Sequence, residues 1–246
     1  KYEVIILMNK YKVDIIQNID LICECAGYSN EVYMIDKSTE TKIFYENKES
    51  DAQCMVVIKD EKTCYVCFRG TSSVKDMCID LEIWRRKPRF LEKCNVHAGA
   101  LKQYESLRNS LLSYYEMYEE IIFTGHSLGS MSASIAALDC KCNYGKEVSC
   151  ITFGSPRVGD RKFAKKFNEC IKCHFRCVNN YDPITYTPTM IRFCHLNNRV
   201  VLKNEKVYFD KPSCTICVLY NINDHSMENY ITGLNLYRET KCESLK

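Results

Sequence analysis

The sequence predicts an α/β fold in which a mostly parallel sheet is covered by helices on both faces. Short runs rich in β-branched and aromatic residues alternate along the chain with longer stretches whose apolar residues recur at helical spacing. This alternation is typical of parallel strands, because each crossover needs a connection that is usually a helix. The chain has 246 residues, 46% of them hydrophobic, which is enough for one large core. We therefore expect a single domain over residues 1–246.

Residues 1–50 are expected to form a helical extension that packs on this domain. Apolar residues at Val13, Ile16 and Ile19 have helical spacing, and Gly27 then supplies a helix stop. Strands are predicted over residues 54–58, 63–68, 121–124, 148–153, 173–178, 198–202 and 215–220. Helices are predicted between several of them, over residues 98–115, 128–139, 160–171 and 225–237.

The net charge argues against a nucleic-acid partner, and the hydropathy argues against a membrane-spanning segment. The formal net charge is only +3, from 34 basic and 31 acidic residues spread along the chain, so we expect no nucleic-acid partner. No apolar run approaches the roughly 18–20 residues that span a bilayer.

Seventeen cysteines and a first residue other than methionine favour a secreted protein. The absence of any Asn-x-Ser/Thr acceptor keeps a cytoplasmic location as the alternative.

The strongest chemical signal is a serine between two glycines. The apolar run 121–124 leads into Gly125-His126-Ser127-Leu128-Gly129, and a helical stretch of small residues follows. In a strand–turn–helix context, Gly-x-Ser-x-Gly presents the serine hydroxyl above the sheet, and the glycines permit the crowded backbone. The pattern therefore predicts an α/β-hydrolase fold with Ser127 as its nucleophile.

A serine hydroxyl needs an imidazole base to become a nucleophile, and only three histidines follow Ser127. His174 lies inside a predicted strand, where packing explains it, and His195 has no evident loop to present it. His225 follows a predicted strand and a polar turn, which places it at the carboxyl edge of the sheet. Ligands meet open α/β sheets at that edge, so we predict that His225 is the base.

The base in turn needs a carboxylate, for which Asp182 is the favoured candidate. Asp182 follows a predicted strand and precedes Pro183, which prevents a helix from continuing through this turn. An ordinary turn aspartate is the competing interpretation. Asp160 opens a predicted helix, so N-capping explains it, and Asp224 would have to fold back on its own neighbour.

In these residues the chain resembles the class 3 lipase family from about residue 51 to the C-terminal helix. The resemblance rests on the Ser127 elbow and on residues 68–72, 96–99, 152–159, 180–184 and 224–226, in that order along the chain. It implies that Asp182 and His225 complete a triad with Ser127. It also implies an oxyanion hole made by Thr71 and by the backbone N–H of Leu128.

The same resemblance places a short helical lid after Thr71, at residues 74–81. One apolar face of such a helix would consist of residues spaced i, i+3, i+4 and i+7, namely Val74, Met77, Cys78 and Leu81. A covering helix of this kind can close a site in water and open it at a lipid interface. A helix that is simply packed on the core is the alternative interpretation.

The cysteines depart from the family pattern. Three Cys-x-x-Cys pairs have the spacing of zinc or haem sites, at residues 64–67, 170–173 and 214–217. So many cysteines produce such pairs by chance, and a pair within a strand points its two sulfurs to opposite faces, so we expect no cofactor and no metal. By the resemblance, Cys23 or Cys25 would form a disulfide with Cys242, and the peptide bond before Pro156 would be cis.

Together these features predict a lipase or carboxylic ester hydrolase that cleaves acylglycerol esters through an acyl-enzyme intermediate. Phospholipase A1 and a soluble-substrate (aryl) esterase are alternatives on the same scaffold, and a non-catalytic lipid-binding relative is a third. The set of Ser127, Asp182, His225 and Thr71 argues against the third, because binding alone does not require it. The expected partners are a lipid ester substrate and, through the lid, a transient lipid interface, with the protein itself a monomer.

Overall fold

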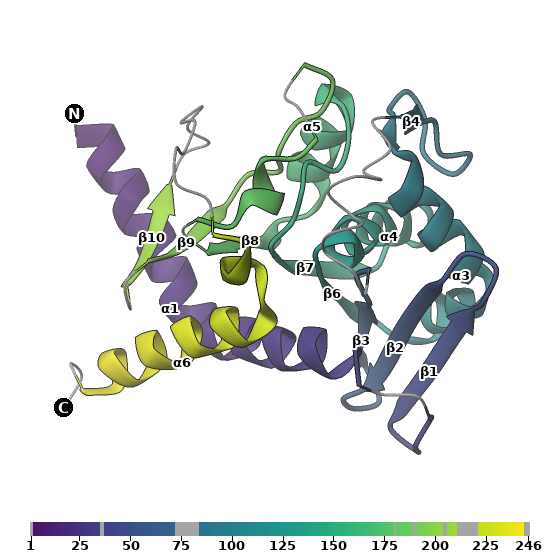
Figure 1. Cartoon of the computed structure of the whole chain (residues 1–246), viewed down its shortest axis with the longest axis horizontal. Coiled ribbons are helices and arrows are strands. Elements are labelled where there is room, and N and C mark those ends of the chain that lie inside the picture. The colour runs from purple at the N-terminus through teal and green to yellow at the C-terminus, as the bar shows by residue number, and fades with distance from the viewer. Residues whose placement is uncertain are drawn as a thin grey trace.

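A sheet of eight strands lies at the centre of the computed structural model (Figure 1). The structure describes residues 2–34, 37–71, 84–179, 181–188, 191–203, 206–210 and 221–243. Within these residues the strand order is β1-β2-β3-β6-β7-β8-β9-β10. The bounds are β1 Lys42–Asn47, β2 Ala52–Ile58, β3 Thr63–Phe68, β6 Glu120–His126, β7 Glu147–Phe153, β8 Cys173–Asn179, β9 Arg199–Lys203 and β10 Lys206–Asp210. The strands from β3 to β9 run parallel, while β1, β2 and β10 pair antiparallel at the two edges.

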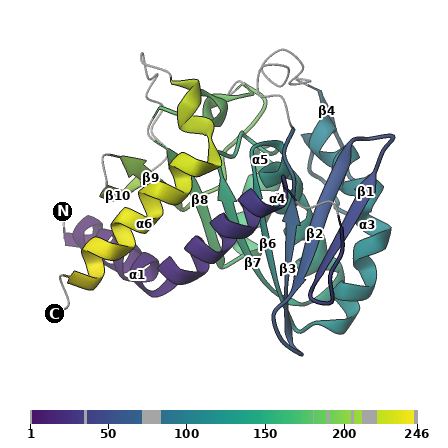
Figure 2. The ribbon, with the colours of Figure 1, turned by 60° about the horizontal axis from the view of Figure 1, so that its bottom comes forward.

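Helices cover both faces of the sheet, as the sequence predicts. Figure 2 shows α1 (Tyr2–Glu31) and α6 (Met227–Glu243) side by side on one face, where they contact each other. The other face carries α3 (Ala98–Met117), α4 (Leu128–Tyr144) and α5 (Arg161–Cys170). Short 3-10 helices η1 (Pro183–Tyr186) and η2 (Ile222–His225) and a small ribbon of β4 (Arg85–Arg86) with β5 (Val96–His97) complete the described elements. None of the described helices has both the length and the hydropathy required to cross a bilayer.

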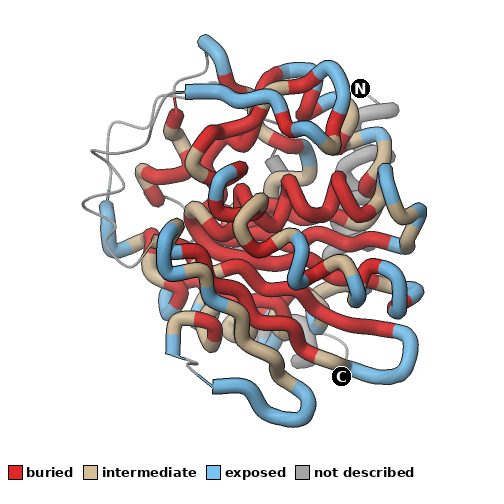
Figure 3. The backbone as a smooth tube through the Cα atoms, turned by 90° about the vertical axis from the view of Figure 1, so that its right-hand side faces the viewer, coloured by how far each residue is buried: buried red, intermediate tan, exposed pale blue. Residues whose placement is uncertain are grey.

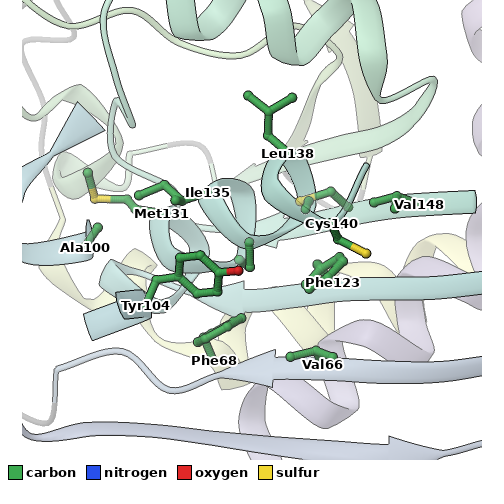
Figure 4. Close-up of a cluster of buried hydrophobic side chains, with 14 of the residues drawn as sticks. Val66, Phe68, Ala100, Tyr104, Phe123, Met131, Ile135, Leu138, Cys140 and Val148 are labelled. Atoms are coloured by element: carbon green, nitrogen blue, oxygen red, sulfur yellow. The ribbon is translucent and has the colours of Figure 1, made fainter. Parts of the chain in front are cut away.

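Two hydrophobic clusters lie on opposite sides of the sheet, because successive side chains of a strand alternate between its faces. In β6, Ile121 and Phe123 belong to the cluster under α3 and α4, whereas Ile122 belongs to the cluster under α1 and α6. Figure 4 shows Phe123 in the first cluster with Tyr104 from α3. Buried residues gather in the interior strands, while exposed residues lie mainly in the connections (Figure 3).

The strands predicted from residue 54 to residue 202 and all four later helices are found, with ends shifted by a few residues. β1 and β10 were not predicted. β1 lies inside the segment 1–50 that was expected to be helical, and it is an edge strand whose half-exposed residues lack a clear apolar alternation. The strand predicted at residues 215–220 lies outside the described residues. The Ser155–Pro156 peptide bond is trans, so the expectation of a cis bond was wrong.

Candidate active site

Ser127 occupies a strained turn between β6 and α4. Its backbone has φ 59° and ψ −127°, a conformation that is rare for a residue with a side chain and is typical of a nucleophile elbow. The flanking glycines are required by space. A Cβ on Gly129 would lie 2.2 Å from the carbonyl oxygen of Phe68, and a Cβ on Gly125 would lie 2.7 Å from the backbone of Gly129. The helix can therefore approach the sheet closely and hold the serine at the sheet edge.

The structure brings Ser127, His225 and Asp182 together from three separate parts of the chain. The Ser127 hydroxyl lies 2.9 Å from Nε2 of His225, and Nδ1 of His225 lies 2.8 Å from Oδ2 of Asp182. All three side chains are buried, with exposed fractions of 0–1%. A proton on Nδ1 donated to the carboxylate leaves Nε2 as the acceptor of the serine proton, which is the arrangement of a nucleophile with its base.

Other groups satisfy and orient the buried carboxylate of Asp182. Its Oδ1 accepts the backbone N–H of Ile184 at 2.9 Å, which caps η1, and its Oδ2 accepts the hydroxyl of Tyr230 at 2.7 Å. The Tyr230 hydroxyl also accepts the backbone N–H of Asn179 at 2.9 Å. With every oxygen hydrogen-bonded, the carboxylate can remain buried beside the imidazole.

Gly154 makes room for the contact between the acid and the base. It has φ +57°, and a Cβ there would lie 2.9 Å from Oδ2 of Asp182 and 2.9 Å from Cε1 of His225. Any side chain at this position would therefore strain the backbone and push the pair apart. Sequence reasoning placed Gly154 only within the resembling segment 152–159 and assigned it no role.

His126 contacts the backbone of the base, His225, and helps to hold it in place. Its Nε2 lies 2.7 Å from the backbone oxygen of His225, and its Nδ1 lies 3.0 Å from the hydroxyl of Tyr33. Since a carbonyl only accepts, Nε2 must carry the proton, and Nδ1 accepts from Tyr33. Burial and then the charge of His225 hold the pKa of His126 well below its usual value, which keeps the ring neutral. Nothing in the sequence distinguishes Tyr33 from the other sixteen tyrosines.

Of the two residues expected to form the oxyanion hole, Leu128 directly follows Ser127, and Thr71 follows a glycine that lies against Ser127. Parallel pairing of β3 with β6 sets Phe68 opposite Gly125, so the segment that ends at Thr71 runs beside the elbow. A Cβ on Gly70 would lie 3.1 Å from Cβ of Ser127, and Leu128 is the first residue of α4. The residues expected to form the lid lie outside the described part of the chain: Val74, Met77, Cys78 and Leu81.

The rejected candidates for the acid have structural roles. Asp160 caps α5 through a 2.9 Å hydrogen bond from the backbone N–H of Phe163, and it also accepts the backbone N–H of Asn95 at 3.0 Å. Asp224 accepts the backbone N–H of Tyr181 at 3.2 Å. N-capping by Asp160 agrees with the interpretation of that residue from sequence.

The described cysteines show no metal site and no disulfide. No group of three or more His, Cys, Asp or Glu in the described residues could hold a metal ion. Cys64 and Cys67 belong to opposite core clusters, as their spacing in a strand predicts. The side chain of Cys242 lies outside the described residues, so its pairing with Cys23 or Cys25 stays a prediction.

Comparison with known proteins gives one family model, described as Lipase (class 3), which matches residues 65–191. A lipase of Rhizomucor miehei is 33% identical over 152 residues, which cover 56% of this chain and 41% of that protein. The chloroplastic phospholipase A(1) DAD1 of Arabidopsis thaliana is 37% identical over 89 residues, covering 35% of this chain and 20% of that protein. The matched segments thus span less than half the length of these relatives.

Similarity in three dimensions extends further along the chain. The solved structure of the Rhizomucor miehei triacylglyceride lipase superposes with a TM-score of 0.74, covering 85% of this chain and 93% of the other. At 24% sequence identity, that likeness shows a shared fold.

Proposed function

This chain belongs to the class 3 lipase family, and from that premise we propose that it is a serine hydrolase of lipid esters, with acylglycerols as its substrates. The observation that carries the proposal is the position of His225, within hydrogen-bonding distance of both the Ser127 hydroxyl and the Asp182 carboxylate. A protein that only binds lipid has no need for this buried chain of three groups. We also propose that residues 1–246 act as one domain and as a monomer.

In the proposed reaction, Oγ of Ser127 attacks the ester carbonyl carbon while Nε2 of His225 takes the hydroxyl proton. The backbone N–H groups of Thr71 and Leu128 would hold the oxyanion of the tetrahedral intermediate. His225 then gives its proton to the departing alcohol, which leaves an acyl group on Ser127. A water molecule, deprotonated by His225, attacks the acyl-enzyme, and the carboxylic acid is released as the serine recovers its proton.

Two exposed apolar side chains in neighbouring segments favour a substrate at a lipid surface. Trp84 is 70% exposed and Ile191 is 91% exposed. A 3.3 Å hydrogen bond from Nη1 of Arg85 to the backbone oxygen of Arg192 brings their two segments together. Apolar and basic side chains together suit contact with lipid and its anionic head groups. This surface supports acylglycerols over dissolved aryl esters.

Phospholipase A1 activity is the second candidate function. The observation that favours it is the similarity to the phospholipase A(1) DAD1 of Arabidopsis thaliana, which is 37% identical over 89 residues. The two candidates use the same triad and differ only in the group esterified to the acyl chain. Rates on emulsified triacylglycerol and on phosphatidylcholine vesicles, measured with one enzyme preparation, would rank them.

The proposal is tested by labelling with a fluorophosphonate and by hydrolysis of p-nitrophenyl esters. Ser127→Ala should abolish labelling and lower the rate by roughly 10⁶-fold, because the nucleophile of a triad is lost. The matched control is Ser110→Ala, which alters an exposed serine of α3 and should leave both readouts unchanged. Retention of more than a few per cent of the rate by Ser127→Ala would refute the proposed nucleophile.

The lid is a separate part of the proposal. If residues 74–81 close the site, replacing Met77 and Leu81 by serine should weaken the activation that an interface produces. Hydrolysis of a short dissolved ester should be almost unaffected. Equal losses on both substrates would mean that this segment packs on the core, and the assignment of Ser127 would be untouched.

A further inference from the structure

A buried arginine on β8 has two nitrogens without a partner. Arg176 is only 3% exposed, and neither its Nε nor its Nη2 has a hydrogen-bond partner among the described residues. The guanidinium group cannot be deprotonated under ordinary conditions, and burying an unpaired charge is strongly unfavourable. Buried charges in folded proteins are therefore paired with an opposite charge.

The surroundings of Arg176 are cationic. In the sheet, Arg176 lies opposite Arg199 of β9. Burial, and then the charges of Arg199 and Arg157, lower the pKa of Arg176 to about 9. The strongest charges acting on Arg176 include no carboxylate. Asp182, the buried carboxylate after β8, is already bonded to Ile184, His225 and Tyr230.

A second buried nitrogen belongs to the same cluster. Nδ1 of His195 has no hydrogen-bond partner in the part of the chain that the structure describes. After burial, the charges of Arg176, Arg157 and Arg199 are the main causes that hold the pKa of His195 well below its usual value. Nη1 of Arg157 meanwhile donates to the backbone oxygens of Tyr186 and Pro188. The cluster thus joins β8 and β9 to the segment that follows Asp182.

We propose that Arg176 binds a small oxyanion, whose two oxygens accept hydrogen bonds from Nε and Nη2. These two nitrogens lie on one edge of the guanidinium plane, and their parallel N–H bonds match the oxygens of a carboxylate or a phosphate. The negative charge would compensate the buried charge of Arg176. The bound anion would stabilise the packing of β8 and β9 against the η1 segment. It would not contact the reacting atoms of the triad.

The proposal is tested by thermal denaturation of the full chain at equal ionic strength in sodium chloride, acetate or phosphate. A ligand at about 100 times its dissociation constant should raise the melting temperature of a chain of this size by roughly 5–10 °C. We expect that rise in acetate or phosphate relative to chloride. Equilibrium dialysis with radiolabelled acetate and phosphate should show about one bound anion per chain, and the anion that binds identifies the source.

Variants separate the site from general salt effects, because phosphate also stabilises proteins by exclusion from their surface. Arg176→Met should lose the difference between the salts, whereas Arg161→Met, which alters an exposed arginine of α5, should keep it. If Arg176→Met does not fold, Arg176→Lys keeps the charge without the two-nitrogen edge and should also lose the preference. A wild-type melting temperature that is equal in all three salts, absence of either bound label, or a preference that persists in Arg176→Lys would overturn the proposal.

Discussion

The hydroxyl of Tyr230 in α6 donates to Oδ2 of Asp182 across 2.7 Å. The same oxygen accepts Nδ1 of His225, so a tyrosine 48 residues along the chain from Asp182 helps to orient the candidate acid. Burial and then the charge of Asp182 raise the pKa of Tyr230 well above its ordinary value, which keeps the phenol protonated as a donor. Tyr230 is thus a positioning residue for the triad.

Tyr230→Phe should lower kcat about tenfold and change KM little, because one hydrogen bond to a charged acceptor is lost while the substrate contacts remain. Steady-state kinetics on a short dissolved ester would measure the change. Tyr237→Phe, in the same helix, is the matched control and should leave kcat unchanged. A Tyr230→Phe enzyme with the parent kcat would show that the carboxylate is oriented without the phenol.

Asp182→Asn should lower kcat by roughly 10⁴-fold, because the amide no longer selects the tautomer of His225 in which Nε2 accepts the serine proton. Asp160→Asn should change kcat little, since asparagine can still cap α5. Both rates can be measured with one dissolved ester, after circular dichroism has shown that each variant is folded. The opposite ranking would mean that another carboxylate serves His225.

Replacement of Trp84 and Ile191 by serine should reduce activity on an emulsified ester by roughly tenfold or more, because each apolar side chain contributes about 1.5–3 kcal/mol when fully transferred out of water. Activity on a short dissolved ester should stay near the parent value. The control is Met117→Ser, which removes a 68% exposed side chain at the end of α3, before β6 begins. If Met117→Ser has the same effect, general surface hydrophobicity explains the result and these two residues do not bind the interface.

His97 should make the protein sensitive to acid. Its Nδ1 accepts the backbone N–H of Ala100 at 3.3 Å and so caps α3, while burial lowers its pKa to about 4. Because the folded pKa lies below the unfolded value of about 6.5, this stabilisation is complete above pH 6.5 and is lost as the pH falls toward 4. Protonation of Nδ1 would also remove the cap.

His97→Asn should keep a capping acceptor but should not titrate in this range. Urea unfolding at several pH values between 7.5 and 4 should then show a shallower loss of stability than the parent, by up to about 1.4 kcal/mol per pH unit. At pH 7.5, the difference in unfolding free energy between the parent and His97→Asn measures the packing that is lost with the imidazole ring. Parallel curves for the two proteins across this range would show that His97 does not cause the acid sensitivity.

Local side-chain patterns were sufficient to predict the sheet interior and the candidate triad. β3 and β6 are buried on both faces, because they pack against both helical layers. Each is therefore a short run of mostly apolar residues that can be recognised from the sequence alone. The Ser127 elbow can be recognised in the sequence because its glycines and its turn lie within five residues, although the backbone of Phe68 on β3 is what crowds Gly129. Asp182 and His225 followed from chain order and strand ends, which parallel topology brings to one edge of the sheet.

The tertiary structure alone decided which side chains surround these groups. The hydroxyl of Tyr33 contacts His126, which lies 93 residues further along the chain. Gly154 contacts Asp182 and His225 because the end of β7 packs against the two turns that carry them. β1 is an edge strand that pairs only with β2 in the described sheet. Its strand conformation therefore depends on this pairing rather than on an apolar pattern of its own. Arg176 reads in sequence as an ordinary strand residue, and only the packing of β8, β9 and the η1 segment buries its charge among other arginines. Such contacts join residues that are distant in sequence, and their distances depend on how whole helices and strands pack, which no local spacing encodes.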